Sequence, residues 1–229
     1  MDTPDNREAP EAFIDKFRSR WPEWGVAIAF VPAAQRAFGE AWLALLQEFA
    51  DAAWAGEEAA PGLAKLAWWQ DELQGWQRGA RRHPLARHLR DRPVDWSAVA
   101  QALNGLPATR DQDRAVAAAS LAPLAAALAQ AEAVAAAPDD RHAAAPAPQQ
   151  AVDLLVGVLL AERALRRGGR EDAEGVLGTW RPAHGAGTRL RRIQAGLLRH
   201  RLQAVAAGRQ PVPLPAWRLL PLAWRAARG

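Results

Sequence analysis

Apolar residues recur three and four positions apart along most of the chain, which is the spacing of one face of an α-helix. The two-residue alternation of a half-buried strand is not found over any useful length. Helices are expected after Pro10, over 33–54, after Pro61, after Pro93, and over 110–137, 152–167 and 188–206. The pattern therefore predicts an all-α protein.

The helix expected after Pro61 reads KLAWWQDELQGWQRG and has a single apolar stripe, formed by Leu66, Trp69, Leu73 and Trp76. By the same helical count, Glu72 is expected to point away from the centre of that stripe. Gly79 is expected to end the helix in a left-handed cap, and His83 to act as a cap for the next one. Such a stripe usually belongs to a protein core.

Proline, glycine and polar residues divide the chain without suggesting a second domain. We expect a flexible N-terminus over 1–10, one helical domain over 11–229, a loop over 135–150, and a basic tail over 207–229 with a terminal turn or short helix. In the longest helix, 33–54, the side chains expected to face inward are Phe38, Trp42, Leu45, Leu46 and Phe49.

Composition narrows the class of protein. The chain has 229 residues and no cysteine, which excludes a disulfide framework and a thiol nucleophile. The polar, acidic start is unlike a signal peptide, and the longest apolar run, about 154–161, is too short to span a bilayer. These features favour a cytoplasmic protein, with a peripheral position at the inner membrane face as an alternative.

Charge is distributed unevenly. Residues 176–229 hold ten arginines and no acid, so the preceding 175 residues hold 19 basic and 25 acidic residues, a net of −6 within a total of +4. A basic end suggests an anionic partner, such as a membrane surface or an acidic protein. The alternative is that this end packs on the acidic body of its own chain. Nucleic acid is not expected as a partner, because no recognised binding module accompanies the charge.

The residues of this end that could meet a membrane or a protein lie on the helix 188–206 and in the tail. They are Arg189, Arg191, Arg192, Arg199, Arg201, Trp217 and Trp224. The helix is amphipathic and basic, as in helices that lie on anionic surfaces. The two tryptophans would suit a headgroup interface or, equally, the cover of an apolar core.

Two motifs carry a resemblance to a known family. The pattern LAWW-x-DEL-x5-G-x3-HPL-x3-L, preceded by AFVPAAQRAFGEAWLALLQEFADAAW, resembles the bacterial squalene/phytoene synthase family, including its divergent branch related to a mitochondrial complex I assembly factor. The resemblance covers about residues 21–89. It implies the isoprenoid-synthase fold, a helical bundle around a central cavity, here narrowed by Trp54.

The resemblance also implies where catalysis would occur. In that family, carboxylates on two facing helices hold magnesium ions that neutralise the leaving diphosphate. The first motif should fall at Ala50, Asp51 and Trp54, where only Asp51 is a ligand, with Glu48 as a partial substitute. Arg36 resembles a diphosphate contact of the family. The alternatives are that Arg36 is a surface arginine or a partner of Glu40 on the next turn.

The second motif should lie near residues 151–169, but Asp153 and Glu162 are nine positions apart and nearly on opposite helix faces. Losing most of both clusters should cost about four or more powers of ten in rate. We therefore expect a non-catalytic interaction, assembly or lipid-binding protein that needs no cofactor. The alternative is an active prenyltransferase with an unorthodox Mg2+ site. An isoprenoid or other lipid, a protein and a membrane surface all remain candidate partners.

Overall fold

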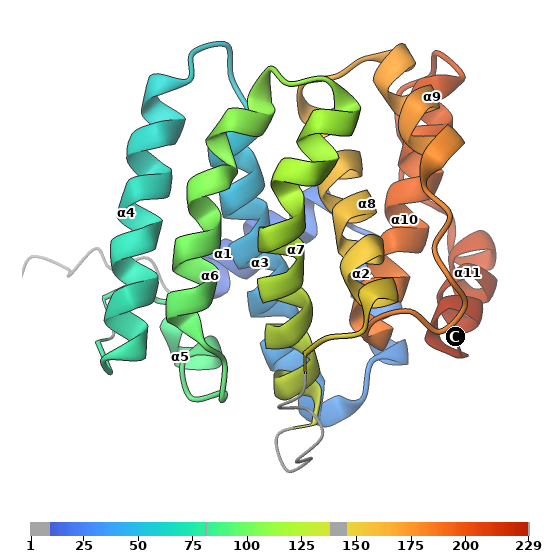
Figure 1. Cartoon of the computed structure of the whole chain (residues 1–229). Coiled ribbons are helices and arrows are strands. Elements are labelled where there is room, and N and C mark those ends of the chain that lie inside the picture. Colours follow the sequence, from blue (N-terminus) through green and yellow to red (C-terminus); the bar gives the residue numbers. More distant parts are fainter. Residues whose placement is uncertain (1–9, 81, 138–145, 229) are drawn as a thin grey trace, which may run out of the picture.

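The structure, a computed structural model, describes residues 10–80, 82–137 and 146–228, and every regular element in these ranges is helical (Figure 1). The all-α, single-domain prediction is confirmed. Residues 1–9 of the predicted flexible N-terminus lie outside the described residues, whereas Pro10 already begins the first helix. Residues 138–145 of the predicted loop also lie outside the described residues.

The elements follow in the order α1 (Pro10–Arg20), α2 (Trp24–Ala27), η1 (Ile28–Phe30), α3 (Ala33–Trp54), α4 (Ala60–Gln77), α5 (Ala86–Leu89), α6 (Trp96–Ala102), η2 (Leu103–Gly105), η3 (Pro107–Arg110), α7 (Arg114–Ala136), α8 (Gln149–Arg166), α9 (Arg170–Thr179), α10 (Arg189–Ala206) and α11 (Ala216–Arg228). The predicted bounds of α3 agree with the structure. Thr188 caps α10, because its side chain accepts a hydrogen bond from the Arg191 N–H.

The long helices pack side by side around α3. This helix contacts α1, α4 and α8, while α7 lies between α6 and α8 (Figure 1). Towards the C-terminus, α10 packs on α8, α9 and α11. The residues predicted to face inward from α3 are all buried, but so is every other residue between Phe38 and Ala50, because neighbouring helices surround this part of α3.

The C-terminal end of α3 is closed by a distant arginine. The Arg110 guanidinium donates to the backbone carbonyls of Ala53, Ala55, Gly56 and Glu57. Ala53 O and Ala55 O belong to the carbonyls that a helix end leaves without partners, Gly56 O and Glu57 O lie just beyond it, and a cation there also matches the helix dipole. The last turn of α3, which carries Asp51 and Trp54, is thereby held in place.

Helix α7 is long and apolar enough to cross a membrane by length and composition, and it is the one helix of the described ranges that meets this test. The alanines of α7 raise its mean hydropathy. The length of the longest unbroken apolar run does not reveal this property. Within the bundle, α7 packs on α6 and α8 and carries a buried glutamate, Glu132.

Candidate functional site

Asp51, the one ligand expected at the first aspartate motif, lies among cations from two other helices. Its Oδ1 accepts from Arg20 Nη1 of α1 at 2.5 Å and from Arg166 Nε of α8 at 2.8 Å. Lys16 Nζ lies 3.9 Å from the other oxygen, Oδ2. Burial alone would raise the pKa of Asp51, but Arg166 and Arg20 outweigh burial and hold the pKa below its ordinary value.

Glu48 lies one turn earlier on the same face, as the sequence predicted, and is bound in the same way. Its two oxygens accept from Lys16 Nζ at 2.6 Å and from Lys65 Nζ of α4 at 2.5 Å. Burial alone would raise the pKa of Glu48. The two lysines lower this pKa by more than burial raises it, so it lies below its ordinary value and the carboxylate is held ionised. Each oxygen of Glu48 therefore already has a cationic partner.

The helix expected to carry the second motif, α8, does pack on α3 and carries Glu162. This residue is buried and pairs with Arg166, the same arginine that binds Asp51. Asp153 lies on the exposed side of α8 and accepts from Gln149 instead. The helical count had placed Asp153 and Glu162 on nearly opposite faces, and the structure agrees.

We call these side chains the charge cluster: Lys16, Arg20, Glu48, Asp51, Lys65, Glu162 and Arg166. It combines four cations with three carboxylates. Within the described residues, no group of three or more histidine, aspartate or glutamate side chains is arranged to hold a metal ion. Next to the cluster, Asp51 and Lys65 line an open depression of about 580 Å³ between the end of α3 and the start of α4.

Arg36 binds the backbone of its own chain and does not pair with Glu40, the partner expected as one alternative. Its guanidinium donates to Val31 O at 2.9 Å and Ala29 O at 3.0 Å, closing the turn before α3. Glu40 pairs with Arg18 instead. At 1.5 Å per residue, Arg36 and Asp51 are about 22 Å apart along α3, so the two cannot hold one diphosphate. The assignment of Arg36 as a diphosphate contact stays a prediction, and its guanidinium is bound to two backbone carbonyls of its own chain.

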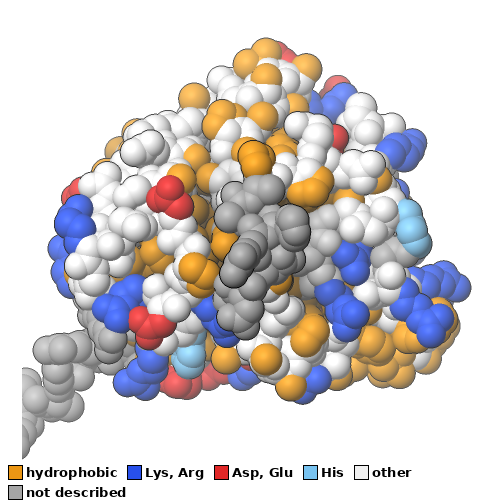
Figure 2. Space-filling model, turned by 60° about the horizontal axis from the view of Figure 1, so that its bottom comes forward, with side chains coloured by type: hydrophobic (Ala, Val, Ile, Leu, Met, Phe, Trp, Pro, Cys, Tyr) orange, Lys and Arg blue, Asp and Glu red, His pale blue; other side chains and the backbone are white. Residues whose placement is uncertain are grey.

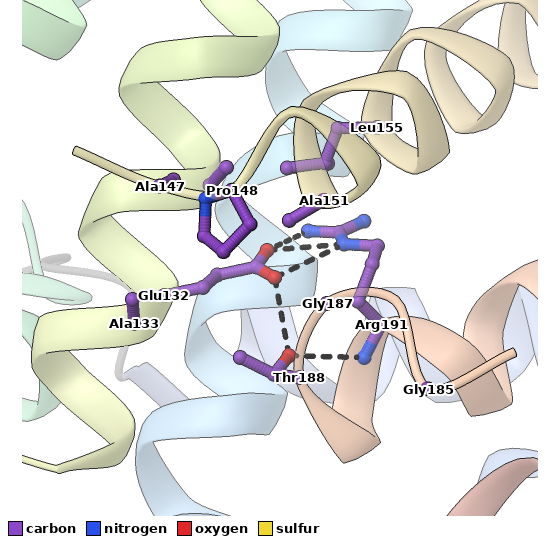
Figure 3. Close-up of a pocket in the computed structure, with 11 residues that line it drawn as sticks. Glu132, Ala133, Ala147, Pro148, Ala151, Leu155, Gly185, Gly187, Thr188 and Arg191 are labelled. Carbon is purple, nitrogen blue, oxygen red and sulfur yellow. Dashed lines mark hydrogen bonds and ion pairs between the residues drawn. The ribbon is translucent and has the colours of Figure 1, made fainter. Parts of the chain in front are cut away.

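The bundle also has a pocket of about 260 Å³ between α7, α8 and the loop before α10 (Figure 3). Its walls are largely small and apolar, and its polar side is an ion pair between Glu132 and Arg191. Glu132 also accepts from Trp42 Nε1 at 2.8 Å and from Thr188 Oγ1 at 3.2 Å. All the hydrogen-bonding groups of this buried pair therefore have partners within the chain.

Arg191 is 1% exposed, so its assignment to a membrane or partner surface was wrong. Its partner, Glu132, lies 59 residues earlier and was not among the site residues expected from the sequence. One signal was present: Glu132 is the only charged residue between positions 115 and 137. A lone acid in an alanine-rich helix of the core needs a buried cation.

The two polar sites are joined. Gln194 Nε2 donates to Glu162 of the charge cluster at 3.3 Å, and Gln194 Oε1 accepts from Arg191. A continuous run of hydrogen bonds and ion pairs thus crosses the bundle through α4, α3, α1, α8, α10 and α7. The central cavity expected around Trp54 stays a prediction. Trp54 itself is fully buried and donates from Nε1 to Thr109 Oγ1 at 3.0 Å.

The tryptophan-rich motif of α4 has a structural role. Glu72 is 0% exposed, which corrects the expectation that it points away from the core. One of its oxygens accepts from Trp76 Nε1 at 2.7 Å and from the His83 N–H at 2.8 Å, and Arg82 pairs with the other. Gly79, at φ +92°, ends the helix in the left-handed conformation predicted for it.

His83 is packed in an aromatic box of Phe13, Trp68 and Trp69. Its Nδ1 accepts from the Leu85 N–H at 3.2 Å, which fits the cap predicted before α5. Burial is the main cause that lowers the pKa of His83 to about 4, against smaller opposing effects of Glu72 and Glu48. The neutral ring therefore belongs to the core.

Most of the basic residues of α10 bind within the chain. Arg192 donates to Ala226 O and Ala227 O at the end of α11, and Arg199 donates to Trp180 O. Arg201 pairs with Glu23 at 2.9 Å. For these three arginines, packing on the chain's own body is the alternative that the structure supports. Arg189 is exposed and stays a candidate for an external contact.

Helix α11 presents a different surface. Trp217 is 68% exposed and Trp224 is 47% exposed, so neither covers the core. Figure 2 shows apolar side chains, with basic ones next to them, at the lower right of the molecule, the side on which α11 lies. The prediction that these two tryptophans belong to a contact surface therefore remains open.

Comparison with known proteins adds no constraint: no protein-family model, no curated protein and no solved structure matches this chain.

Proposed function

We propose that this protein is a divergent, non-catalytic relative of the squalene/phytoene synthase family, which acts by binding a partner and not by turning over a prenyl diphosphate. The family assignment rests on the motifs of residues 21–89. The observation that carries the functional part is the charge cluster, in which Asp51 and Glu48 are already bound to cationic side chains.

The physical argument concerns competition for carboxylate oxygens. Mg2+ requires a near-octahedral set of oxygen ligands at about 2.0–2.1 Å. Here Arg166, Arg20 and Lys16 surround Asp51, and any ion approaching its oxygens would meet their positive charge. Binding a metal would require breaking these ion pairs, and the low pKa of Asp51 reflects how strongly the pairs hold. This favours a structural role for the remnant of the motif.

The alternative, an active prenyltransferase with an unorthodox Mg2+ site, would have to use the same two carboxylates. Trp54 occupies the position of the motif's third carboxylate and is fully buried. Nor does the pocket of Figure 3 favour a buried isoprenoid: at about 260 Å³ it is below the roughly 300–1,000 Å³ of pockets that enclose drug-sized ligands. A protein or a lipid surface is the partner class that we favour.

The test is a turnover assay. The purified full chain is incubated with Mg2+ or Mn2+ and farnesyl or geranylgeranyl diphosphate, and pyrophosphate release is measured for the wild type and Asp51→Ala. We expect no release above the background of the Asp51→Ala variant. Metal-dependent release that disappears in this variant would overturn the proposal.

Three controls make the result unambiguous. Asp153→Ala removes an exposed carboxylate from α8 without touching the charge cluster, so it should behave as the wild type does in either case. Circular dichroism of each variant establishes that it is folded. An active enzyme of the squalene synthase type, measured in parallel, shows that the substrates and metals are competent.

A further inference from the structure

Helix α11 has a broad apolar face, of which one part is buried and the adjoining part is exposed. The buried part, formed by Leu219, Ala223 and Ala227, lies against the bundle, where α11 packs on α10 and α2. The exposed part is a stripe of Trp217, Leu220 and Trp224 that faces solvent, and Leu220 alone is 44% exposed. Positions i, i+3 and i+7 share one helix face, so these three side chains form one continuous surface.

A basic stripe runs beside the apolar one. Arg218, Arg225 and Arg228 are all exposed, and no acid occurs anywhere from residue 176 to 229. The guanidinium carbon of Arg218 lies 4.6 Å from the centre of the Trp217 ring, and that of Arg228 lies 4.1 Å from the Trp224 ring. The arginines thus lie at the edge of the apolar stripe, where a partner that accepts the tryptophans would also meet their charge.

Charge complementarity indicates that the partner is anionic. The size of the exposed surface of α11 distinguishes the two classes of anionic partner, a protein and a lipid bilayer. A specific protein interface buries about 1,200–2,000 Å² in total, with a polar rim of both signs. A helix of 13 residues is only about 20 Å long, and it offers three apolar side chains and a single sign of charge. A bilayer surface requires less: a narrow apolar face that enters the headgroup region, tryptophans at its edge, and arginines for anionic lipids.

We propose that α11 docks this protein on an anionic phospholipid surface, with Trp217, Leu220 and Trp224 in the interface and Arg218, Arg225 and Arg228 among the lipid phosphates. Arg192 anchors the end of α11 to α10 through Ala226 O and Ala227 O, so the helix is presented as part of the folded body. The inference goes beyond the proposed function and does not depend on the loss of catalysis.

The experiment is flotation of the full chain with two kinds of vesicle: pure phosphatidylcholine, and an equal mixture of phosphatidylcholine and phosphatidylglycerol. We expect binding to the anionic vesicles at about 0.1 M salt, and much weaker binding at about 0.5 M, because surface charges are screened. Binding to the neutral vesicles should be weaker still. Trp217→Ala/Trp224→Ala should lower the partition coefficient by about tenfold or more, since aromatic anchors dominate such surfaces.

A second pair of variants tests the charge. Arg218→Gln/Arg225→Gln should weaken binding by about fivefold for each arginine removed. Its matched control is Arg78→Gln/Arg87→Gln, which removes the same charge from exposed positions far from α11 along the chain and should leave binding unchanged. Trp68→Ala is the corresponding control for the tryptophans, because Trp68 is 43% exposed and belongs to α4.

Three results would each overturn the proposal. The first is equal binding to neutral and anionic vesicles, and the second is binding by the α11 variants that equals the wild type. The third is a chain that stays in solution with both vesicles. Self-association in that case, lost in Trp217→Ala/Trp224→Ala by analytical ultracentrifugation, would assign the surface to a second copy of the chain.

Discussion

Individual polar residues of this chain take their roles from the neighbours that the fold brings to them. Glu72 is a core residue because Trp76, His83 and Arg82 meet it, and Asp51 is an ion-pair residue because α1 and α8 bring arginines to it. Residue type and helical position located Asp51 and Glu48 on one face. The cations that decide their chemistry could not be predicted, because they come from other helices.

His83 provides a test at this scale. Its ring is neutral in the folded protein, because its pKa is about 4, whereas a histidine in the unfolded chain has a pKa of about 6.5. Between these values the unfolded state binds a proton that the native state does not. The free energy of unfolding should therefore fall as the pH is lowered from about 6.5 to about 4, and be fully retained above that window.

The measurement is urea unfolding of the wild type and His83→Asn at about pH 7 and about pH 5, where model carboxyl groups remain ionised. Asparagine can keep the acceptor for the Leu85 N–H but does not titrate. We expect the wild type to lose more stability than His83→Asn over this interval. An equal loss in both proteins would show that His83 does not contribute to the pH dependence.

At the scale of helices, periodicity predicted the long elements well and the short ones poorly. Residues 33–54 and 188–206 have clear apolar faces and good boundaries, so their ends were found closely. Helix α9 is not among the helices expected from the sequence, because it is short, polar and contains glycines. Only a terminal turn or short helix was expected in the region of α11, because prolines interrupt the sequence there. Its buried residues, Leu219, Ala223 and Ala227, nevertheless have a helical period.

The contact between α3 and α4 depends on a glycine that no pattern marked. A Cβ added to Gly62 would lie 2.0 Å from the backbone oxygen of Ala52, so α4 could not keep its position against α3. Gly62→Ala should lower the free energy of unfolding by about 1–3 kcal/mol, as overpacking does. This loss is expected although alanine favours a helix by up to about 1 kcal/mol.

The matched control is Gly178→Ala in α9, where an added Cβ has no atom within 4 Å. Here only helix propensity acts, and stability should rise by up to about 1 kcal/mol. Urea unfolding of both variants separates the two effects. If Gly62→Ala were also stabilised, the close approach of α3 and α4 would be wrong.

At the scale of the whole molecule, part of the excess positive charge near the C-terminus binds to the N-terminal part of the chain. Arg201 of α10 donates to Arg20 O at 2.7 Å and pairs with Glu23, next to α2, at 2.9 Å. Its guanidinium carbon also lies 3.5 Å from the centre of the Trp21 ring. The sequence indicated the two charged regions, but not that a single arginine would join them, since Glu23 and Arg201 are 178 positions apart.

The last prediction follows from this junction. Arg201→Gln leaves the Glu23 carboxylate, which is 1% exposed, without its cation. Breaking a buried pair on one side should lower the free energy of unfolding by about 3 kcal/mol. Because the pair is buried, the loss should persist at about 0.5 M salt, where surface charge effects are largely screened.

Arg189→Gln is the matched variant, since Arg189 is an exposed arginine at the start of the same helix, and it should change stability by no more than about 0.5 kcal/mol. Hydrogen exchange locates the effect: in Arg201→Gln, the amides of α1 and α2 should exchange faster than those at the centre of α3. Equal stability of the two variants would mean that the basic residues of α10 contribute only net charge. A loss confined to Arg201→Gln, with faster exchange at the N-terminal helices, would mean that the C-terminal part of the bundle holds the beginning of the chain in place.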